Sequence, residues 1–129
     1  MKEALIRVNL IPIGKPRMTQ RDRWKKRPTV LRYHAWKDEL KKNLPVIDFV
    51  PDRIIAICKM PMPKSWSKKK QDRMEGKLHD QKPDADNILK AITDTILPED
   101  KCIGAAAIVT RWATHGEMHI ILRKEEEHD

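Results

Sequence analysis

A chain of 129 residues is long enough for one compact domain with a hydrophobic core, but too short for two ordinary domains. Its 27 Lys and Arg against 19 Asp and Glu give a formal net charge of +8, which favours a polyanionic partner, either nucleic acid or an anionic membrane surface. No apolar run approaches the ~20 residues that a spanning helix needs, and no basic segment has a matching long apolar face, so we expect no membrane partner.

The first predicted element is a strand that leads into a basic arm. Residues 3–11 alternate with the period of a half-buried strand, which Gly14 and Pro16 end. The segment 15–27 shows no apolar period and is predicted to be a loop or arm. A run of like charge usually serves solubility, but the density of basic residues here favours contact with phosphate groups. The predicted contacts are Lys15, Arg17, Arg21, Arg23, Lys25, Lys26 and Arg27.

A helix and a second strand follow the arm. Thr29 is placed to cap a helix that runs to about Leu44, because apolar side chains recur there at fourfold spacing until Pro45 closes the segment. Residues 54–62 alternate again, with apolar side chains on both faces near the start. This pattern predicts a strand that is buried on both sides.

The next segment, 65–77, is a second basic element, in which Ser67 is placed to cap a short exposed helix. Residues 84–97 then show the clearest amphipathic period of the chain and predict a helix. Two strands, 102–113 and 117–123, are predicted to form a hairpin. The second basic element adds three predicted phosphate contacts, Lys68, Lys69 and Lys70.

These elements predict an α+β fold, in which a mixed or antiparallel sheet of about four strands packs with two to three helices. We expect one domain over residues 1–124, including a basic arm at 14–28, and a disordered acidic tail at 125–129. Cys58 and Cys102 have no partner at C-x-x-C spacing, so we expect core cysteines and neither a disulfide nor a zinc site. The N-terminus lacks the apolar core of a signal peptide, which indicates the cytoplasm.

The segment Lys82-Pro83-Asp84-Ala85-Asp86-Asn87 gathers acids inside a basic protein. Pro83 disfavours helical geometry at the residue before it, so Asp84 is expected at the helix N-cap and Asp86 in the first turn. Residues two apart on a helix point roughly 200° apart, so the two carboxylates converge only if Asp84 stays extended. A converged pair would be a hard oxygen site that suits Mg²⁺ or Mn²⁺.

Further charged residues extend this cluster. The helix places Asp86, Lys90 and Asp94 on one face, where Lys90 can reach a phosphate held by the metal. Glu99-Asp100 forms a third acidic centre, which only the tertiary structure can bring to the helix start. Caps and i, i+4 pairs of this kind are also ordinary helix stabilisers. The density of acids in a basic chain favours the metal site, because a metal ion relieves the repulsion between carboxylates.

The run from Lys82 to Ala91, followed by Asp94 and Glu99-Asp100, resembles the RusA-type Holliday junction resolvases, which phages and prophages often encode. The resemblance implies a homodimeric endonuclease of a bacterial or phage-infected cell that uses Mg²⁺ to make paired nicks across a four-way DNA junction. It further implies that Lys90 is the functional lysine and that Asp94 is structural. The metal-binding catalytic carboxylates that it implies are Asp84, Asp86 and Asp100, with Glu99 standing where many members have Asp.

Two alternatives remain open at this point. Pro83-Asp84 followed by Glu99-Asp100-Lys101 satisfies the loose P-D…(D/E)-x-K nuclease signature, which makes Glu99 and Lys101 catalytic, although a helix lies where a strand hairpin is usual. A non-enzymatic DNA-binding module would use the acids as caps and the arm as a phosphate clamp. Only a nuclease should bind divalent metal and lose it when Asp84 or Asp86 becomes Asn.

Three ring side chains in basic or motif-flanking positions have two interpretations each. Trp24 and Trp66 can stack on unpaired bases, but packing over the sheet is favoured for both. His79 precedes the acidic motif, and an exposed loop position is favoured over a metal or phosphate contact.

Overall fold

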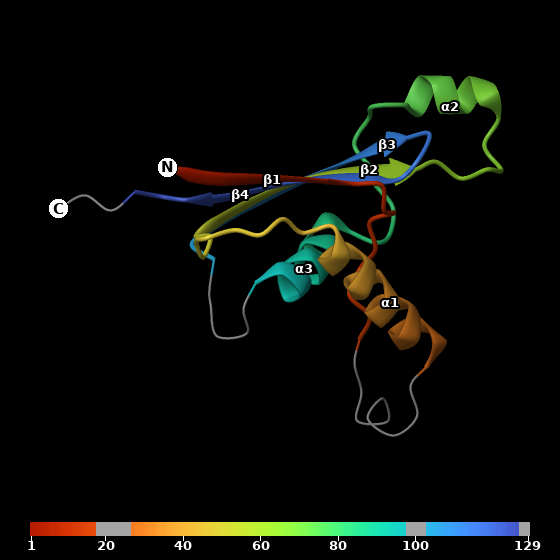
Figure 1. Ribbon diagram of the computed structural model, residues 1–129. Helices are drawn as coiled ribbons and strands as arrows, with labels where there is room; N and C mark the ends of the chain where they lie inside the picture. Colours follow the sequence, from red (N-terminus) through yellow and green to blue (C-terminus); the bar gives the residue numbers. More distant parts are fainter. Residues whose placement is uncertain (18–26, 98–102, 127–129) are drawn as a thin grey trace.

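A four-stranded mixed sheet forms the centre of the protein, with two helices under one face and a third, short helix beyond the other face at one end (Figure 1). The computed structural model describes residues 1–17, 27–97 and 103–126. The predicted α+β fold is confirmed. In the part of the chain described, no helix combines the length and the apolar character that crossing a membrane requires.

The sheet has the strand order β1-β4-β2-β3. β4 (Glu117–Lys124) runs antiparallel to both β1 (Lys2–Val8) and β2 (Arg53–Pro61), whereas β3 (Ala105–Ala113) runs parallel to β2. The predicted hairpin is therefore wrong, although both of its strands exist. β2 lies between β3 and β4, but its side chains are buried on one face only, and Ile57 on the other face is 39% exposed, so the predicted burial on both sides is wrong.

α1 (Pro28–Lys42) and α3 (Ala85–Ile96) cover one face of the sheet (Figure 1). The predicted cap of α1 at Thr29 is wrong, since the N-cap is Arg27 and has no side-chain capping bond. Proline is favoured at the first helical position, because its fixed φ suits the helix and its missing N–H has no intrahelical partner there. Pro28 therefore starts α1 before Thr29 is reached.

The hydrophobic core lies between the sheet and these two helices. Leu40 of α1 and Ile88 and Ile92 of α3 are fully buried there, against the alternate side chains of the strands. Cys58 of β2 is also fully buried, and burial raises the pKa of its thiol to about 12. Its predicted core position is confirmed, whereas Cys102 lies outside the described residues.

α2 (Lys68–Met74) begins at Ser67, whose hydroxyl accepts a hydrogen bond from the Lys70 N–H at 3.2 Å, as predicted. It buries none of its side chains. It is attached to the sheet through Trp66, whose ring lies edge-on to the Trp112 ring of β3 with 4.9 Å between the ring centroids. The packing interpretation of Trp66 is thus confirmed, and Trp24 lies outside the described residues. His79 also packs against Trp112, at 4.5 Å, so the exposed position predicted for it is wrong.

The last described residues contact the domain. The Glu125 N–H donates a hydrogen bond to Asp52 at 3.0 Å, and the Glu125 carboxylate pairs with Arg53 at 3.2 Å. Glu126 pairs with the N-terminal ammonium group of Met1. Two residues that the sequence assigned to an acidic tail therefore contact the domain, and Glu126 joins the two ends of the described chain.

Glu117 is a buried carboxylate at the start of β4, 1% exposed. Its pKa is lowered to about 2, mainly by a 2.6 Å hydrogen bond from the Arg7 Nε and also by Lys59 and His119, each 3.3 Å away, and these contacts outweigh burial, which raises it. Its contribution to stability is therefore present above pH 4.5 and lost as the pH falls through about 2. We expect Glu117→Gln to be less stable at neutral pH and to lose less stability on acidification.

Urea unfolding at a series of pH values measures this effect. The control is Glu75→Gln, since Glu75 is an exposed residue at the end of α2. The control should lose stability on acidification as the unchanged protein does. Parallel pH profiles for Glu117→Gln and the control would contradict the role given to Glu117.

Candidate active site

The acidic motif forms the start of α3. Asp84 is the N-cap residue, with extended backbone at φ −75° and ψ 163°, and its Oδ1 accepts a hydrogen bond from the Asn87 N–H at 2.8 Å. Asp86 lies in the first turn, where an acidic side chain interacts favourably with the helix dipole. Both predicted positions are confirmed.

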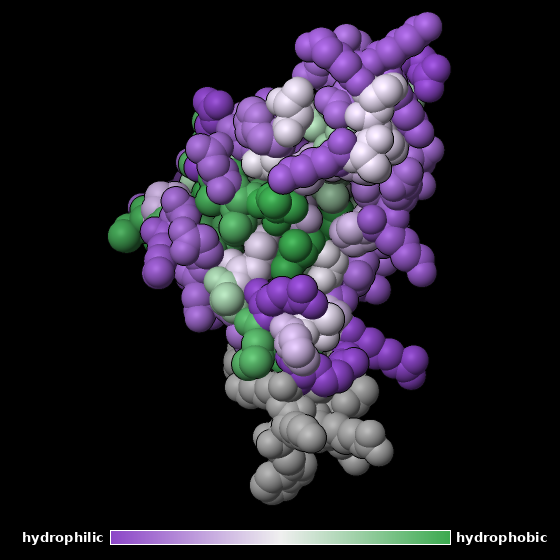
Figure 2. Space-filling model, turned by 90° about the vertical axis from the view of Figure 1, so that its right-hand side faces the viewer, coloured by the Kyte–Doolittle hydropathy of each residue, from purple (hydrophilic) through white to green (hydrophobic). Residues whose placement is uncertain are grey.

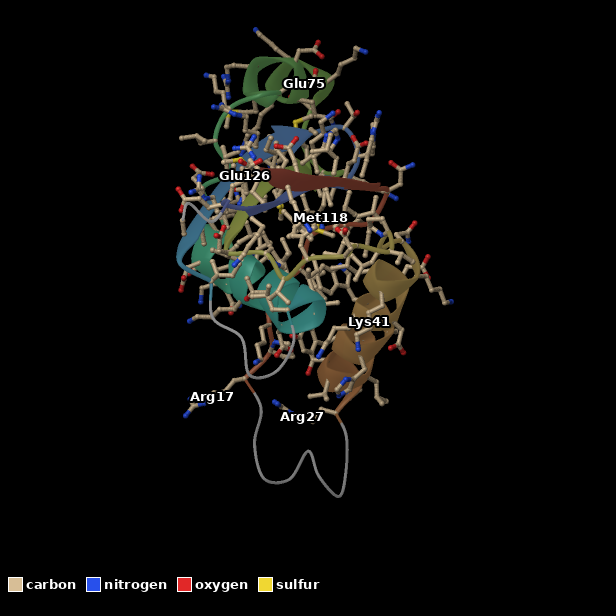
Figure 3. All side chains as sticks on the ribbon, turned by 60° about the vertical axis from the view of Figure 1, so that its left-hand side comes forward. Arg17, Arg27, Lys41, Glu75, Met118 and Glu126 are labelled. Atoms are coloured by element: carbon tan, nitrogen blue, oxygen red, sulfur yellow. The ribbon has the colours of Figure 1, made fainter. Side chains whose placement is uncertain are left out.

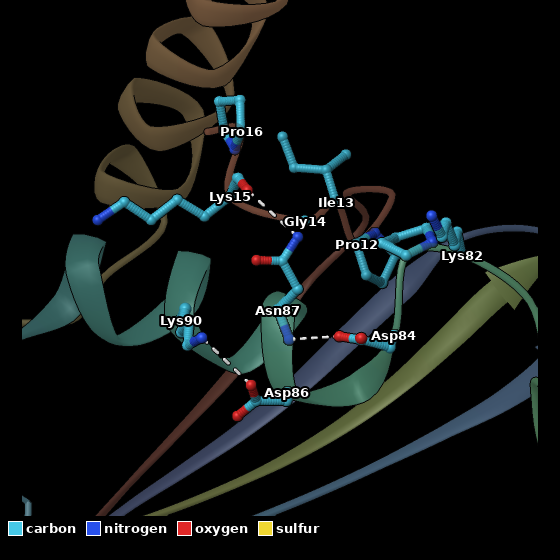
Figure 4. Close-up of a pocket in the computed structure, with 11 residues that line it drawn as sticks. Pro12, Ile13, Gly14, Lys15, Pro16, Lys82, Asp84, Asp86, Asn87 and Lys90 are labelled. Carbon is cyan, nitrogen blue, oxygen red and sulfur yellow. Dashed lines mark hydrogen bonds and ion pairs between the residues drawn. The ribbon is translucent and has the colours of Figure 1, made fainter. Parts of the chain in front are cut away.

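These acids line an open pocket of about 660 Å³ between the start of α3 and the segment 12–16 (Figure 4). Lys90 lines the same pocket, with its Nζ 3.3 Å from Asp86. The two carboxylates point in different directions, Asp84 toward the Asn87 N–H and Asp86 toward Lys90. The structure thus brings three predicted site residues to one pocket without making the carboxylates converge.

The donor atoms of the pocket fit a hard divalent ion. Asp84 is exposed and uses only one carboxylate oxygen for its cap, while the Asp86 side chain is 77% exposed. Mg²⁺ is commonly held by one or two carboxylates and retains several waters. No group of three or more His, Cys, Asp or Glu is close enough to hold a metal among residues 1–17, 27–97 and 103–126. Glu99, Asp100 and Lys101 lie outside these ranges.

Asp94 joins α3 to α1 and to Lys15 at the start of the arm. Its Oδ2 accepts hydrogen bonds from the Tyr33 hydroxyl at 2.6 Å and the Lys37 Nζ at 2.9 Å, and its Oδ1 is 3.6 Å from the Lys15 Nζ. Burial raises the pKa of Asp94, but these hydrogen bonds and charges outweigh burial and hold it below its usual value. The contacts suit a structural residue. Sequence reasoning missed Tyr33 and Lys37, whose only signal was their i, i+4 spacing on α1.

The predicted phosphate contacts fall at two separate places. Arg27 donates a hydrogen bond to the Arg17 carbonyl oxygen at 2.5 Å, which closes the base of the arm at the lower end of Figure 3. Lys68, Lys69 and Lys70 of α2 lie at the opposite end, with the Lys70 Nζ 4.3 Å above the Trp66 ring. Figure 2 shows an apolar area in the middle of one face, with hydrophilic side chains above it and on both sides of it. Arg21, Arg23, Lys25 and Lys26 lie outside the described residues.

The family model described as Endodeoxyribonuclease RusA matches residues 12–122. The chain belongs to the RusA family. This range includes the segment 12–16, the acids at the start of α3 and Glu99-Asp100. No curated protein and no solved structure gave a significant match. RusA is a family of Holliday junction resolvases, so membership makes the chain an endodeoxyribonuclease. This sets aside the non-enzymatic DNA-binding module. It also favours the RusA motif over the P-D…(D/E)-x-K signature.

Proposed function

We propose that this RusA-family chain is a metal-dependent, structure-selective endonuclease that resolves four-way DNA junctions by paired symmetric nicks. The observation that carries the proposal is the open pocket at the start of α3, which Asp84, Asp86 and Lys90 line together. A divalent ion held there, Mg²⁺ or Mn²⁺, would supply a water of lowered pKa and neutralise charge on the phosphate. Asp84 and Asp86, together with Asp100, are its proposed ligands.

Lys90 is proposed to stabilise negative charge on the scissile phosphate. Its side chain is 63% exposed and its partner Asp86 is 77% exposed. Exposed pairs of this kind contribute only about 0–1 kcal/mol, so Lys90 can leave Asp86 for a phosphate oxygen at little cost. A positive charge beside the reacting phosphate would stabilise the negative charge that develops in the transition state.

The basic residues are proposed to hold the DNA on either side of the pocket. Arg17 and Arg27 stand at the base of the arm, and Lys68 and Lys69 of α2 lie at the other end of the molecule (Figure 1). Phosphate contacts at two separated places would allow the protein to hold more than one duplex arm of a branched substrate. The remaining proposed contacts are Lys15, Arg21, Arg23, Lys25, Lys26 and Lys70.

The active enzyme is proposed to be a homodimer. The two strands cut in a four-way junction are related by a two-fold axis, whereas the described residues bring Asp84 and Asp86 together in one pocket per chain. An isologous dimer has the same symmetry as this substrate. Sedimentation of the protein alone and with a junction tests it, and a strictly monomeric complex would contradict the proposal.

The direct test follows strand cleavage of a synthetic four-way junction and a linear duplex of matched sequence, each with Mg²⁺ or with a chelator. We expect symmetric nicks in the junction alone and only with the metal. A junction that is bound but not cut in any divalent metal would overturn the proposed reaction. Equal cutting of the linear duplex would overturn the proposed selectivity.

A further inference from the structure

We infer that Asn87 is a positioning residue that fastens the base of the basic arm to the start of α3. The Asn87 Nδ2 donates a hydrogen bond to the Lys15 carbonyl oxygen at 3.2 Å, and the Lys15 N–H donates one to the Asn87 carbonyl oxygen at 3.4 Å. Figure 4 shows the Asn87 amide directed at Lys15, across the pocket wall. Two residues that are 72 positions apart thus exchange two hydrogen bonds.

Close packing between the two segments leaves no room for a side chain at Gly14. A Cβ atom at position 14 would lie 2.4 Å from the Asn87 Nδ2 and 2.9 Å from the Pro83 Cβ. Contacts under 3.0 Å force the neighbours apart, and Pro83 has a rigid ring. The backbone at Gly14 therefore lies directly against the turn that carries Asp84, and only glycine at position 14 allows the two to come so close.

The same residue contacts one of the proposed metal ligands. The backbone N–H of Asn87 donates to the Asp84 Oδ1 at 2.8 Å, while its side chain holds Lys15. A second attachment lies farther along α3, where the Lys15 Nζ is 3.6 Å from Asp94. Asn87 is thus the link between the proposed carboxylate ligand Asp84 and the segment that leads into the proposed DNA-binding arm.

This link fixes the distance between bound DNA and the carboxylates. Residues 12–16 form one wall of the pocket, and Arg17 follows at the base of the arm. If that wall moves, a phosphate held by the arm moves relative to Asp84 and Asp86, and a displacement of about 1 Å can cost about 10²-fold in rate. This part of the inference rests on the proposed function, whereas the contact between Asn87 and Lys15 does not.

Two substitutions test the inference from opposite sides of the contact. Asn87→Leu keeps the shape of the side chain and removes its donor, and Gly14→Ala leaves every polar group in place but pushes the segment away. Asn43→Leu is the matched control, because the Asn43 Nδ2 also donates to a backbone carbonyl oxygen, that of Glu39, far from the pocket. The double variant of residues 14 and 87 should show less than the summed effect, since both changes break one contact.

The first measurement is hydrogen–deuterium exchange of the full chain without DNA. We expect faster exchange in the segment 12–17 for both single variants and no change there for the control. Unchanged exchange in this segment would overturn the inference, whether or not the chain cuts DNA.

The second measurement is single-turnover junction cleavage with protein in excess. We expect both variants to cut about 10–100-fold more slowly, with junction affinity changed by less than about threefold and with the same Mg²⁺ concentration for half-maximal rate. If a variant loses thermal stability but cuts the junction at the unchanged single-turnover rate, Asn87 has a structural role only, and its proposed positioning role is contradicted. A shifted Mg²⁺ requirement would instead identify a metal ligand. If the protein without substitutions does not cut the junction, the proposed function and the coupling of Asn87 to cleavage are both refuted. The contact between Asn87 and Lys15 would still be tested by hydrogen–deuterium exchange.

Discussion

Asp86→Asn is expected to abolish junction cleavage while the variant still binds the junction. The substitution keeps the size of the side chain but removes the charge that a divalent ion needs at the pocket. Since a bound metal stabilises the transition state by several kcal/mol, the rate should fall by about 10³-fold or more. Single-turnover cleavage measures the rate, and calorimetric titration with Mg²⁺ should show that the metal no longer binds.

The control for this substitution is Asp38→Asn. Asp38 is an exposed residue of α1 and does not line the pocket, so the same chemical change there should leave cleavage unaltered. If Asp86→Asn cuts as fast as the unchanged protein, Asp86 is only a helix-stabilising partner of Lys90. Loss of both cleavage and folding would be recognised by circular dichroism and would also contradict the assigned role.

Leu40→Ala is expected to cost about 2–5 kcal/mol of unfolding free energy. Leu40 is 0% exposed and packs within the core between α1 and the sheet. Truncation removes buried methyl groups and leaves a cavity that the surrounding structure fills only in part. Denaturant unfolding measures the loss, with unchanged m-value if the unfolded state is the same.

Leu31→Ala is the matched control, because Leu31 lies on the same helix and is 52% exposed. The same truncation at an exposed position usually changes stability by less than about 0.5 kcal/mol. Similar losses for the two variants would show that α1 does not pack on the sheet through the face that carries Leu40.

Most elements of the fold could be predicted from the sequence because most have a period of their own, and α2 has a recognisable cap at Ser67. The amphipathic stripe of α3 and the alternation of the strands depend on neighbouring residues, and the structure confirms both. Strand pairing depends on the whole sheet, so the short link at 114–116 suggested a hairpin that does not exist. The start of α1 was placed two positions too late, because a cap at Thr29 was preferred to proline at the first helical position.

The candidate site was predictable in part for the same reason. Pro83 and the helix period place Asp84 and Asp86 at the start of α3, and both lie there. The direction of each carboxylate was not predictable, since it depends on the partners that each finds, Asn87 and Lys90. The wall of the pocket was missed entirely, because no local pattern relates Gly14 to a helix that begins far along the chain.

The strand order has a consequence for synthesis on the ribosome. β4 is made after the other three described strands, yet it lies between β1 and β2 and is the only described strand that pairs with β1. In a nascent chain that ends after β3, β1 therefore has no described strand to pair with, and the pocket wall that follows β1 is not yet held in place. Domains generally fold as units during translation. Chains that stall before β4 should therefore lack the folded pocket, so we expect DNA cutting only after β4 has been made.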